Sequence, residues 1–176
     1  PNKPYLYAEC DSRPGMAEAF EHIRKKGLRK VAFVAGDCDY RDTLDREKIF
    51  EELATLSNFK IMKRIQGDFS RTSGNKIAAA IDIKKMPEVL FCANDRMAFG
   101  IIEGLKKRTV KIPDDVSIIG FDNQSAATLI EPQISTIENP FEDISKAAVN
   151  VLLDSVEGKE AKSVQFASRF LARESA

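Results

Sequence analysis

Residues 88–105, with the sequence EVLFCANDRMAFGIIEGL, decide the fold class of this 176-residue chain. The run Glu88–Ala93 is short and almost wholly apolar, which is typical of a strand buried on both faces. Apolar residues then recur at helical spacing over Ala98–Leu105, and either Asn94 or Asp95 can cap that helix. A buried strand followed directly by an amphipathic helix is the repeating unit of a parallel α/β sheet.

The same unit recurs along the chain. Similar apolar runs stand at Lys30–Ala35, Lys60–Ile65 and Val116–Phe121, with helical patterns between them. This repetition predicts an α/β fold in which helices cover both faces of a parallel sheet through right-handed crossovers.

The last third of the sequence departs from this alternation. Pro132–Ile137 is typical of a short edge strand, because proline lacks a backbone donor. Pro140 is expected to open a helix that Gly158 ends, and Val164–Leu171 to form one closing strand.

Composition excludes several classes of protein. Lys plus Arg number 27 and Asp plus Glu number 27, so no net charge favours nucleic acid or an anionic membrane. Cys10, Cys38 and Cys92 are widely spaced and form no CxxC pair, which fits neither a disulfide framework nor a zinc site. We therefore expect a cytoplasmic protein without a bound metal.

Catalytic signatures are missing from the sequence. It contains no GxSxG elbow, no GxxxxGK phosphate loop and no GxGxxG turn. The single histidine, His22, is expected at a solvated position or near the C-terminus of a helix rather than as a catalytic base. The sequence thus predicts a protein that is not an enzyme and needs no cofactor.

Polar residues gather where the predicted strands end. They are Gly36–Tyr40, Gly67–Ser70, Asn94–Arg96 and Asp122–Gln124. Ligands of open parallel sheets bind at the carboxyl ends of the strands, so a small polar ligand is expected there. Structural alternatives stay open for each residue: a helix cap for Asn94 or Asp95, a turn for Asp122, core packing for Phe69 and a solvated position for Arg46.

Four motifs carry a family resemblance. They are Gly15–Gly36, Ala93–Gly100 (ANDRMAFG), Val110–Asp122 (VKIPDDVSIIGFD) and Pro132–Ile137. In order and spacing they resemble the effector-binding domain of the LacI/GalR family of transcriptional regulators. The resemblance implies a periplasmic-binding-protein-like type I fold, an α/β sandwich of two lobes with parallel sheets.

The resemblance also implies a division of the chain. Residues 1–27 are expected to be part of the N-terminal lobe (a strand and a helix), residues 28–138 a nearly complete C-terminal lobe, residues 139–163 a helix returning to the N-terminal lobe, and residues 164–176 a closing strand. On this division the N-terminal lobe is partial. The apolar stripes of its two helices would then need each other or another chain as partner.

The function implied is effector sensing. A small sugar-like or nucleobase-like ligand would bind between the lobes and control DNA binding by a separate domain, in a homodimer formed through the C-terminal lobe near the helix after Asn94 and the loop after Asp122. By position, the effector-binding residues are Arg46, Phe69, Asn94, Asp122, Asn139 and Phe141, with Phe69 as the stacking aromatic. Pro14 and Asn123–Ser125 depart from the family pattern and leave the ligand's identity open. With one wall of the cleft incomplete, the chain alone is expected to bind effector weakly or not at all.

Two other functions remain open. Pro14–Met16 and Asp39–Arg46 also look similar to LacI-like sensor segments of signalling proteins such as diguanylate cyclases. The aspartates at the strand ends would suit a receiver-like phosphorylatable domain, although no adjacent acidic pair follows the first strand.

Overall fold

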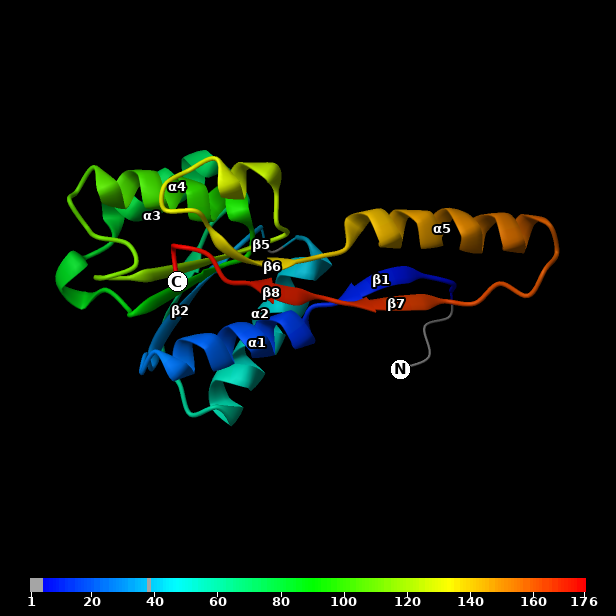
Figure 1. The fold of residues 1–176 in the computed structure, drawn as a ribbon, viewed down its shortest axis with the longest axis horizontal. Helices are drawn as coiled ribbons and strands as arrows, with labels where there is room; N and C mark the ends of the chain where they lie inside the picture. Colours follow the sequence, from blue (N-terminus) through cyan, green and yellow to red (C-terminus); the bar gives the residue numbers. More distant parts are fainter. Residues whose placement is uncertain (1–4, 38) are drawn as a thin grey trace.

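A six-stranded sheet organises most of the chain in the computed structural model, which describes residues 5–37 and 39–176 (Figure 1). The strands lie in the order β3-β2-β4-β5-β6-β8 and are parallel, except that β8 runs antiparallel to β6. Their bounds are β2 Lys30–Ala35, β3 Lys60–Gln66, β4 Val89–Cys92, β5 Ser117–Phe121, β6 Ser135–Glu138 and β8 Arg169–Leu171. Every residue of the central strands β4 and β5 is buried, which explains their continuous apolar sequence.

Four helices cover the two faces of this sheet. They are α1 (Arg13–Lys25), α2 (Arg41–Leu56), α3 (Arg71–Ala80) and α4 (Asp95–Lys106), and two short 3₁₀ helices span Ile83–Lys85 and Ser125–Thr128. Helices α1 and α2 lie on one face, and α3 packs closely on α4 over the other (Figure 1). We call this sheet with α1–α4 the large region.

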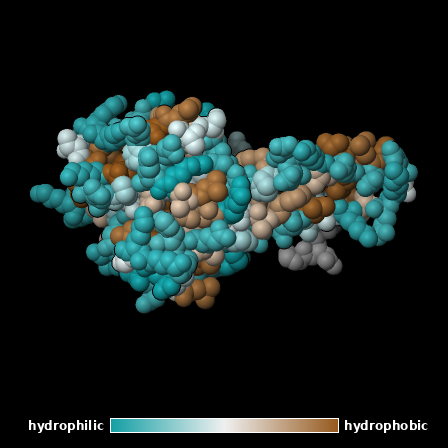
Figure 2. All heavy atoms as spheres, in the orientation of Figure 1, coloured by the Kyte–Doolittle hydropathy of each residue, from teal (hydrophilic) through white to brown (hydrophobic). Residues whose placement is uncertain are grey.

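A second, smaller sheet extends away from the large region. Strand β1 (Ala8–Asp11) pairs in parallel with β7 (Val164–Ala167), and helix α5 (Phe141–Val156) lies along the pair (Figure 1). None of the α5 residues is buried, and apolar side chains show at the surface of this part in Figure 2. We call β1, β7 and α5 the small region.

The chain passes between the two regions at three places. Strand β1 leads into α1 at Ser12, β6 leads into α5 through Asn139 and Pro140, and β7 leads into β8 at Ser168. Three short connections therefore link the regions, and any change in their relative arrangement has to occur there.

Most of the predicted elements are confirmed. The four strands and the helices between them lie where expected, although β3, at the edge of the sheet, has no buried residue. Ser70 caps α3 by accepting from the Ser73 amide, and Gly158 follows α5 in a left-handed conformation. Two predictions are wrong. Strand β6 is not at an edge, because β8 pairs with its outer side, and residues 164–171 form two strands rather than one. The extended segment is interrupted at Ser168 because β7 pairs with β1 of the small region, whereas β8 pairs with β6 of the large region.

Helix α1 corrects the predicted division. Its apolar stripe is buried, with Phe20 only 2% exposed, and the Phe20 ring lies 4.8 Å from the ring of Phe91 and 5.5 Å from that of Phe50. The stripe therefore finds its partner in the large region of the same chain, and the expectation that it needs the other helix or another chain is wrong. The remainder of the predicted division stays a prediction.

No helix within residues 5–37 and 39–176 is long and apolar enough to cross a membrane.

Candidate functional site

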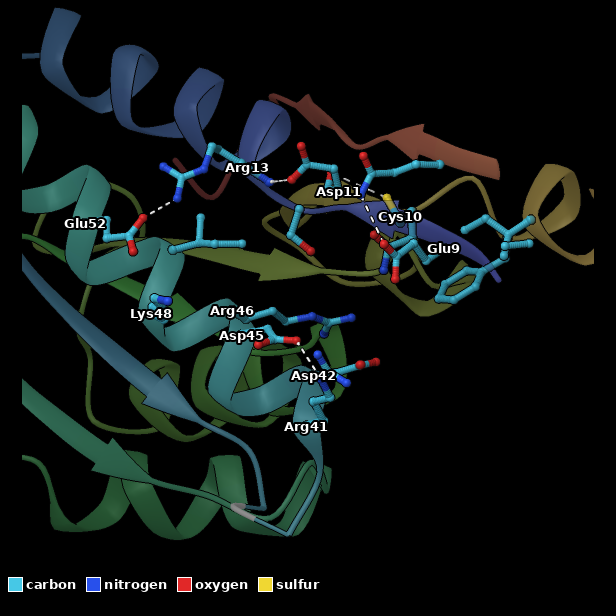
Figure 3. Close-up of a pocket in the computed structure, with 17 residues that line it drawn as sticks. Glu9, Cys10, Asp11, Arg13, Arg41, Asp42, Asp45, Arg46, Lys48 and Glu52 are labelled. Carbon is cyan, nitrogen blue, oxygen red and sulfur yellow. Dashed lines mark hydrogen bonds and ion pairs between the residues drawn. The ribbon is translucent and has the colours of Figure 1, made fainter. Parts of the chain in front are cut away.

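A pocket of about 570 Å³ lies where the two regions meet (Figure 3). Helix α2 forms one wall and strand β1 the opposite one. Asn139 lines the pocket from the second connection, and Phe141 lines it from the start of α5. Because successive strand residues point to opposite faces, Glu9 and Asp11 share one face of β1. Both line the pocket, as do Ala8 and Cys10 of the same strand, and Arg41, Asp45 and Lys48 line it from α2.

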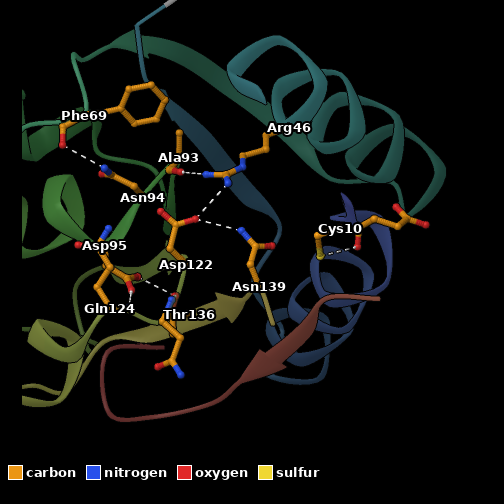
Figure 4. A network of polar contacts seen from close by, with 12 residues as sticks. Cys10, Arg46, Phe69, Ala93, Asn94, Asp95, Asp122, Gln124, Thr136 and Asn139 are labelled. Atoms are coloured by element: carbon orange, nitrogen blue, oxygen red, sulfur yellow. Dashed lines mark hydrogen bonds and ion pairs between the residues drawn. The ribbon is translucent and has the colours of Figure 1, made fainter. Parts of the chain in front are cut away.

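Arg46 stands at the centre of a buried polar network beside the pocket (Figure 4). Its side chain is 11% exposed, and its guanidinium donates to the carbonyl oxygen of Ala93 at 2.6 Å and to Oδ1 of Asp122 at 3.0 Å. The guanidinium carbon lies 3.9 Å from the centroid of the Phe121 ring. These contacts fix the arginine in one geometry, because a planar guanidinium satisfied on two sides has little freedom to turn.

Asn139 carries the one unpaired buried polar atom of this network. Its Nδ2 donates to Oδ1 of Asp122 at 3.1 Å, whereas its Oδ1 has no hydrogen-bond partner within the described part of the chain. The residue is 7% exposed and lines the pocket. A buried acceptor without a partner is costly, so this atom is suited to receive a donor from a bound molecule.

Asp122 follows β5 in a left-handed conformation, with φ 96°, and joins the arginine to the asparagine. Burial raises the pKa of its carboxyl group, and the neighbouring Arg46 limits that rise. A buried carboxylate between a guanidinium and an amide donor has its charge compensated where it stands.

The charged groups of the pocket largely pair with one another. Arg13 pairs with Glu52, and Arg41 lies 3.5 Å from Asp45. Burial raises the pKa of the Cys10 thiol, which also lines the pocket, to about 11, so it stays protonated at neutral pH. No group of three or more His, Cys, Asp or Glu side chains able to hold a metal ion occurs in the described ranges.

Three of the six predicted effector residues line the pocket. They are Arg46, Asn139 and Phe141, and Asp122 holds the first two in place. Phe69 and Asn94 do not line it. For all six, contact with an effector stays a prediction.

Phe69 and Asn94 instead make contacts of their own in the large region. The Phe69 ring lies so close to Gly36 that a Cβ at that glycine would be 2.1 Å from Cζ of the phenylalanine. Asn94 accepts from the Met97 amide at 2.9 Å, as the cap of α4, and donates to the Phe69 carbonyl oxygen at 3.0 Å. Of the two candidates for that cap, the structure therefore uses Asn94.

His22 lies in the last turn of α1, as expected. It is not simply solvated: its ring packs against Phe170 at 5.2 Å, and its Nε2 is buried without a partner among the described residues.

A strand was expected within residues 1–27, but the part that β1 and the residues after it play in the pocket was not predicted. Glu9, Asp11 and Arg13 line the pocket, but Ala8–Asp11 lacks the apolar run by which the other strands were recognised. The alternation of Glu9 and Asp11 is the one signal that could have placed two carboxylates on a common face.

Comparison with known proteins adds a family to this geometry. The family model of the periplasmic binding protein-like domain matches residues 20–176. Among curated proteins, the chain is 29% identical over 155 residues to the HTH-type transcriptional repressor PurR of Aliivibrio fischeri (strain MJ11), covering 85% of this chain and 46% of the repressor. It is also 29% identical over 163 residues to the HTH-type transcriptional repressor CytR of Escherichia coli (strain K12), covering 87% and 46%. The chain spans about half the length of the curated relatives it matches.

Solved structures agree on the fold. A regulatory protein of the LacI family from Chloroflexus aggregans superposes with a TM-score of 0.89 at 23% identity, covering 99% of this chain and 65% of that one. A dimeric lac repressor superposes with a TM-score of 0.87 at 20% identity, covering 94% and 62%. The resemblance that the sequence motifs indicated is confirmed: the chain is similar to LacI-type repressors in sequence and in fold, and it belongs to the periplasmic binding protein-like family.

Proposed function

We propose that this chain senses a small effector for a transcriptional regulator and passes the signal to a separate DNA-binding domain. The observation that carries the proposal is the pocket between the two regions, with the unpaired Oδ1 of Asn139 beside it. The relatives in Aliivibrio and Escherichia are named HTH-type transcriptional repressors, which supports the proposal that the signal controls DNA binding. The same names support a binding role rather than a catalytic one. Because a transcriptional repressor acts on DNA, we propose that the protein works in the cytoplasm.

The pocket favours a neutral ligand rich in hydrogen-bond donors. The free acceptor on Asn139 calls for an O–H or N–H group. The Asp122 carboxylate, 3.0 Å away, already compensates the charge of the buried Arg46 guanidinium, so this arginine attracts a phosphate or carboxylate less than an unpaired one would. Carboxylates also outnumber cations along the lining, with Glu9, Asp11, Asp42, Asp45 and Glu52 against Arg13, Arg41, Arg46 and Lys48. A sugar-like or nucleobase-like molecule meets these conditions.

The position of the pocket suits signalling. Asn139 belongs to a connection between the regions, and β1 and α2 belong to opposite sides. A ligand that contacts both sides binds one relative arrangement of the two regions better than another. Its binding therefore increases the fraction of molecules in the arrangement that it binds better. The three connections are the hinges at which that shift would occur.

We also propose a homodimer through the large region, at α4 and the loop after Asp122. Leu129, at the end of that loop, is 81% exposed, and a large apolar side chain so open to water suits an interface. Size-exclusion chromatography with light scattering on the chain and on Leu129→Glu tests it: the variant should be monomeric, and an unchanged mass would place the interface elsewhere.

The ligand proposal is tested by NMR titration of the ¹⁵N-labelled chain, a method that detects millimolar binding. The panel holds D-ribose, D-galactose, hypoxanthine and adenosine, with D-galacturonate and inorganic phosphate as anions. A neutral ligand should shift the side-chain amide signal of Asn139 and the Nε signal of Arg46 in a saturable way. Asn139→Ala should abolish the effect, and Asn150→Ala, an exposed asparagine on α5, is the matched control. Saturable shifts with the anions alone would refute the proposed ligand class.

A further inference from the structure

Two consecutive residues after β5 adopt the left-handed conformation although neither is glycine. They are Asp122, with φ 96°, and Asn123, with φ 52°. Side chains with a Cβ are strained in this region, and such strain persists only where surrounding contacts enforce it. The turn matters because it directs the Asp122 carboxylate toward Arg46 and Asn139.

Asp95 supplies part of the contacts that hold this turn (Figure 4). The Asp122 amide also donates to the Ile137 carbonyl oxygen, and the Asn123 side chain bonds to Glu138 and Arg173. The Oδ2 of Asp95 accepts from the Gln124 amide at 2.7 Å, and its Oδ1 accepts from the Thr136 hydroxyl at 2.6 Å. That hydroxyl oxygen in turn accepts from the Asn123 amide at 3.3 Å. One carboxylate therefore fixes the amides of both residues that follow Asp122, one directly and one through Thr136.

The space around Asp95 is built for this carboxylate. The residue is 1% exposed, and a Cβ at Gly120 would lie 2.1 Å from its Oδ1. Asp95 does not line the pocket and does not cap α4, because Asn94 does so. A buried carboxylate with neither role needs another reason to be where it is.

We propose that Asp95 is a positioning residue of the ligand site: it enforces the left-handed turn at Asp122 and Asn123 and thereby sets the direction of the Asp122 carboxylate. The proposal concerns the site of the proposed function and rests on it for its biological meaning. Its structural content can be tested without any ligand.

The ionisation of Asp95 makes its hold on the turn at Asp122 and Asn123 depend on pH. The groups that face it are the Asp122 carboxylate at the end of β5, Arg173 of the C-terminal segment and the Cys92 thiol of β4. Burial raises the pKa of Asp95 to about 7. The ionised form accepts from both donors, whereas protonation at Oδ1 forces the Thr136 hydroxyl to reverse and leaves its hydrogen without this acceptor. The turn is therefore held best above pH 7.

Amide hydrogen exchange measured by NMR on the full chain at pH 8 tests the proposal. In Asp95→Ala, the Gln124 and Asn123 amides should exchange at least tenfold faster than in the wild type, while the Met97 amide, which Asn94 holds, keeps its rate. Glu103→Gln, on the same helix but paired with Arg71 at the surface, is the control and should change none of these rates. Unchanged exchange at Gln124 and Asn123 in a folded Asp95→Ala protein would overturn the proposal.

A second pair of variants covers the case in which Asp95→Ala does not fold. Thr136→Val keeps the shape of the side chain but removes the relay, so the Asn123 amide alone should exchange faster, and Thr136→Ser should restore its protection. Equal rates in the valine and serine variants would count against the relay.

The titration separates positioning from simple packing. The Gln124 amide shift of the wild type should follow the ¹³Cγ signal of Asp95 with a midpoint near pH 7, and Asp95→Asn should abolish that transition. A Gln124 amide shift that does not change as the Asp95 carboxyl group titrates would contradict the proposed hold of Asp95 on the turn. Failure of every panel compound to bind would refute the ligand proposal alone, because none of these readouts involves a ligand.

Discussion

The large and the small region differ in how completely they bury their apolar side chains. In the large region, the rings of Phe20 on α1, Phe50 on α2 and Phe91 on β4 pack together in one core between the sheet and these helices. In the small region, α5 has no buried residue, and Leu152 is 63% exposed. The pocket thus lies between a well-packed wall and a weakly packed one, and the stability of the chain has to come from the first.

The strongest test of this comparison removes the centre of the large core. Phe20→Ala should lower the free energy of unfolding by about 3–5 kcal/mol, because the change deletes a buried ring and leaves a cavity. Urea denaturation followed by circular dichroism measures it. A loss below about 1 kcal/mol would mean that the large region does not carry the stability.

The next test concerns the buried network at the wall of the pocket. Arg46→Ala should destabilise the chain by about 3 kcal/mol, because it leaves the buried Asp122 carboxylate without its cation. It should also remove binding of any ligand found in the NMR panel. Thermal melts with and without that ligand check both effects, with Arg64→Ala, an exposed arginine of β3, as control. Equal stability of the Arg46→Ala and Arg64→Ala chains would show that the buried network around Arg46 does not stabilise the fold.

A third prediction uses pH to probe the large region. Burial disfavours the ionised form of Asp95 and raises its native pKa from 3.8 to about 7. The chain is therefore most stable with respect to this group below pH 4 and loses stability as the pH rises through 7, although the ionised form makes the stronger hydrogen bonds to the turn. The wild type should therefore lose roughly 4 kcal/mol relative to Asp95→Asn between pH 4 and pH 8. Urea titrations of both chains across this range give the difference, and parallel curves would refute the raised pKa.

The smallest effect is expected on the small region. Leu152→Ser should change the free energy of unfolding by less than about 0.5 kcal/mol, because the side chain is already exposed to water. A loss above about 2 kcal/mol in the same urea experiment would show that α5 is covered in solution and would remove the contrast between the regions.

The sequence predicted the large sheet well and its margins poorly. Buried strands such as Val89–Cys92 can be recognised in the sequence by a continuous run of apolar residues, because helices cover both faces of the sheet there. Strands β1 and β7 have one partner strand each and no such run, and the break at Ser168 depends on which sheet each half joins. Local pattern carries no information on that choice.

The candidate site shows the same limit. Arg46, Asn139 and Phe141 were named from the resemblance and line the pocket, whereas Glu9 and Asp11 were missed because they lie on the weakly patterned β1. Asn94 and Asp95 were equal candidates for the helix cap. Only the structure distinguishes them, since one accepts from the Met97 amide within its own helix and the other from groups 29 and 41 residues away.

By itself, then, the sequence determined the α/β class, the order of the buried strands and helices, and the family, since these depend on periodicity and on motifs that are local in the chain. The tertiary structure alone decided that α1 packs with the large region, that β7 and β8 join different sheets, and that Asp95 holds the turn at Asp122. Those outcomes depend on contacts between residues far apart in the chain, where burial and hydrogen-bond satisfaction outweigh local preference.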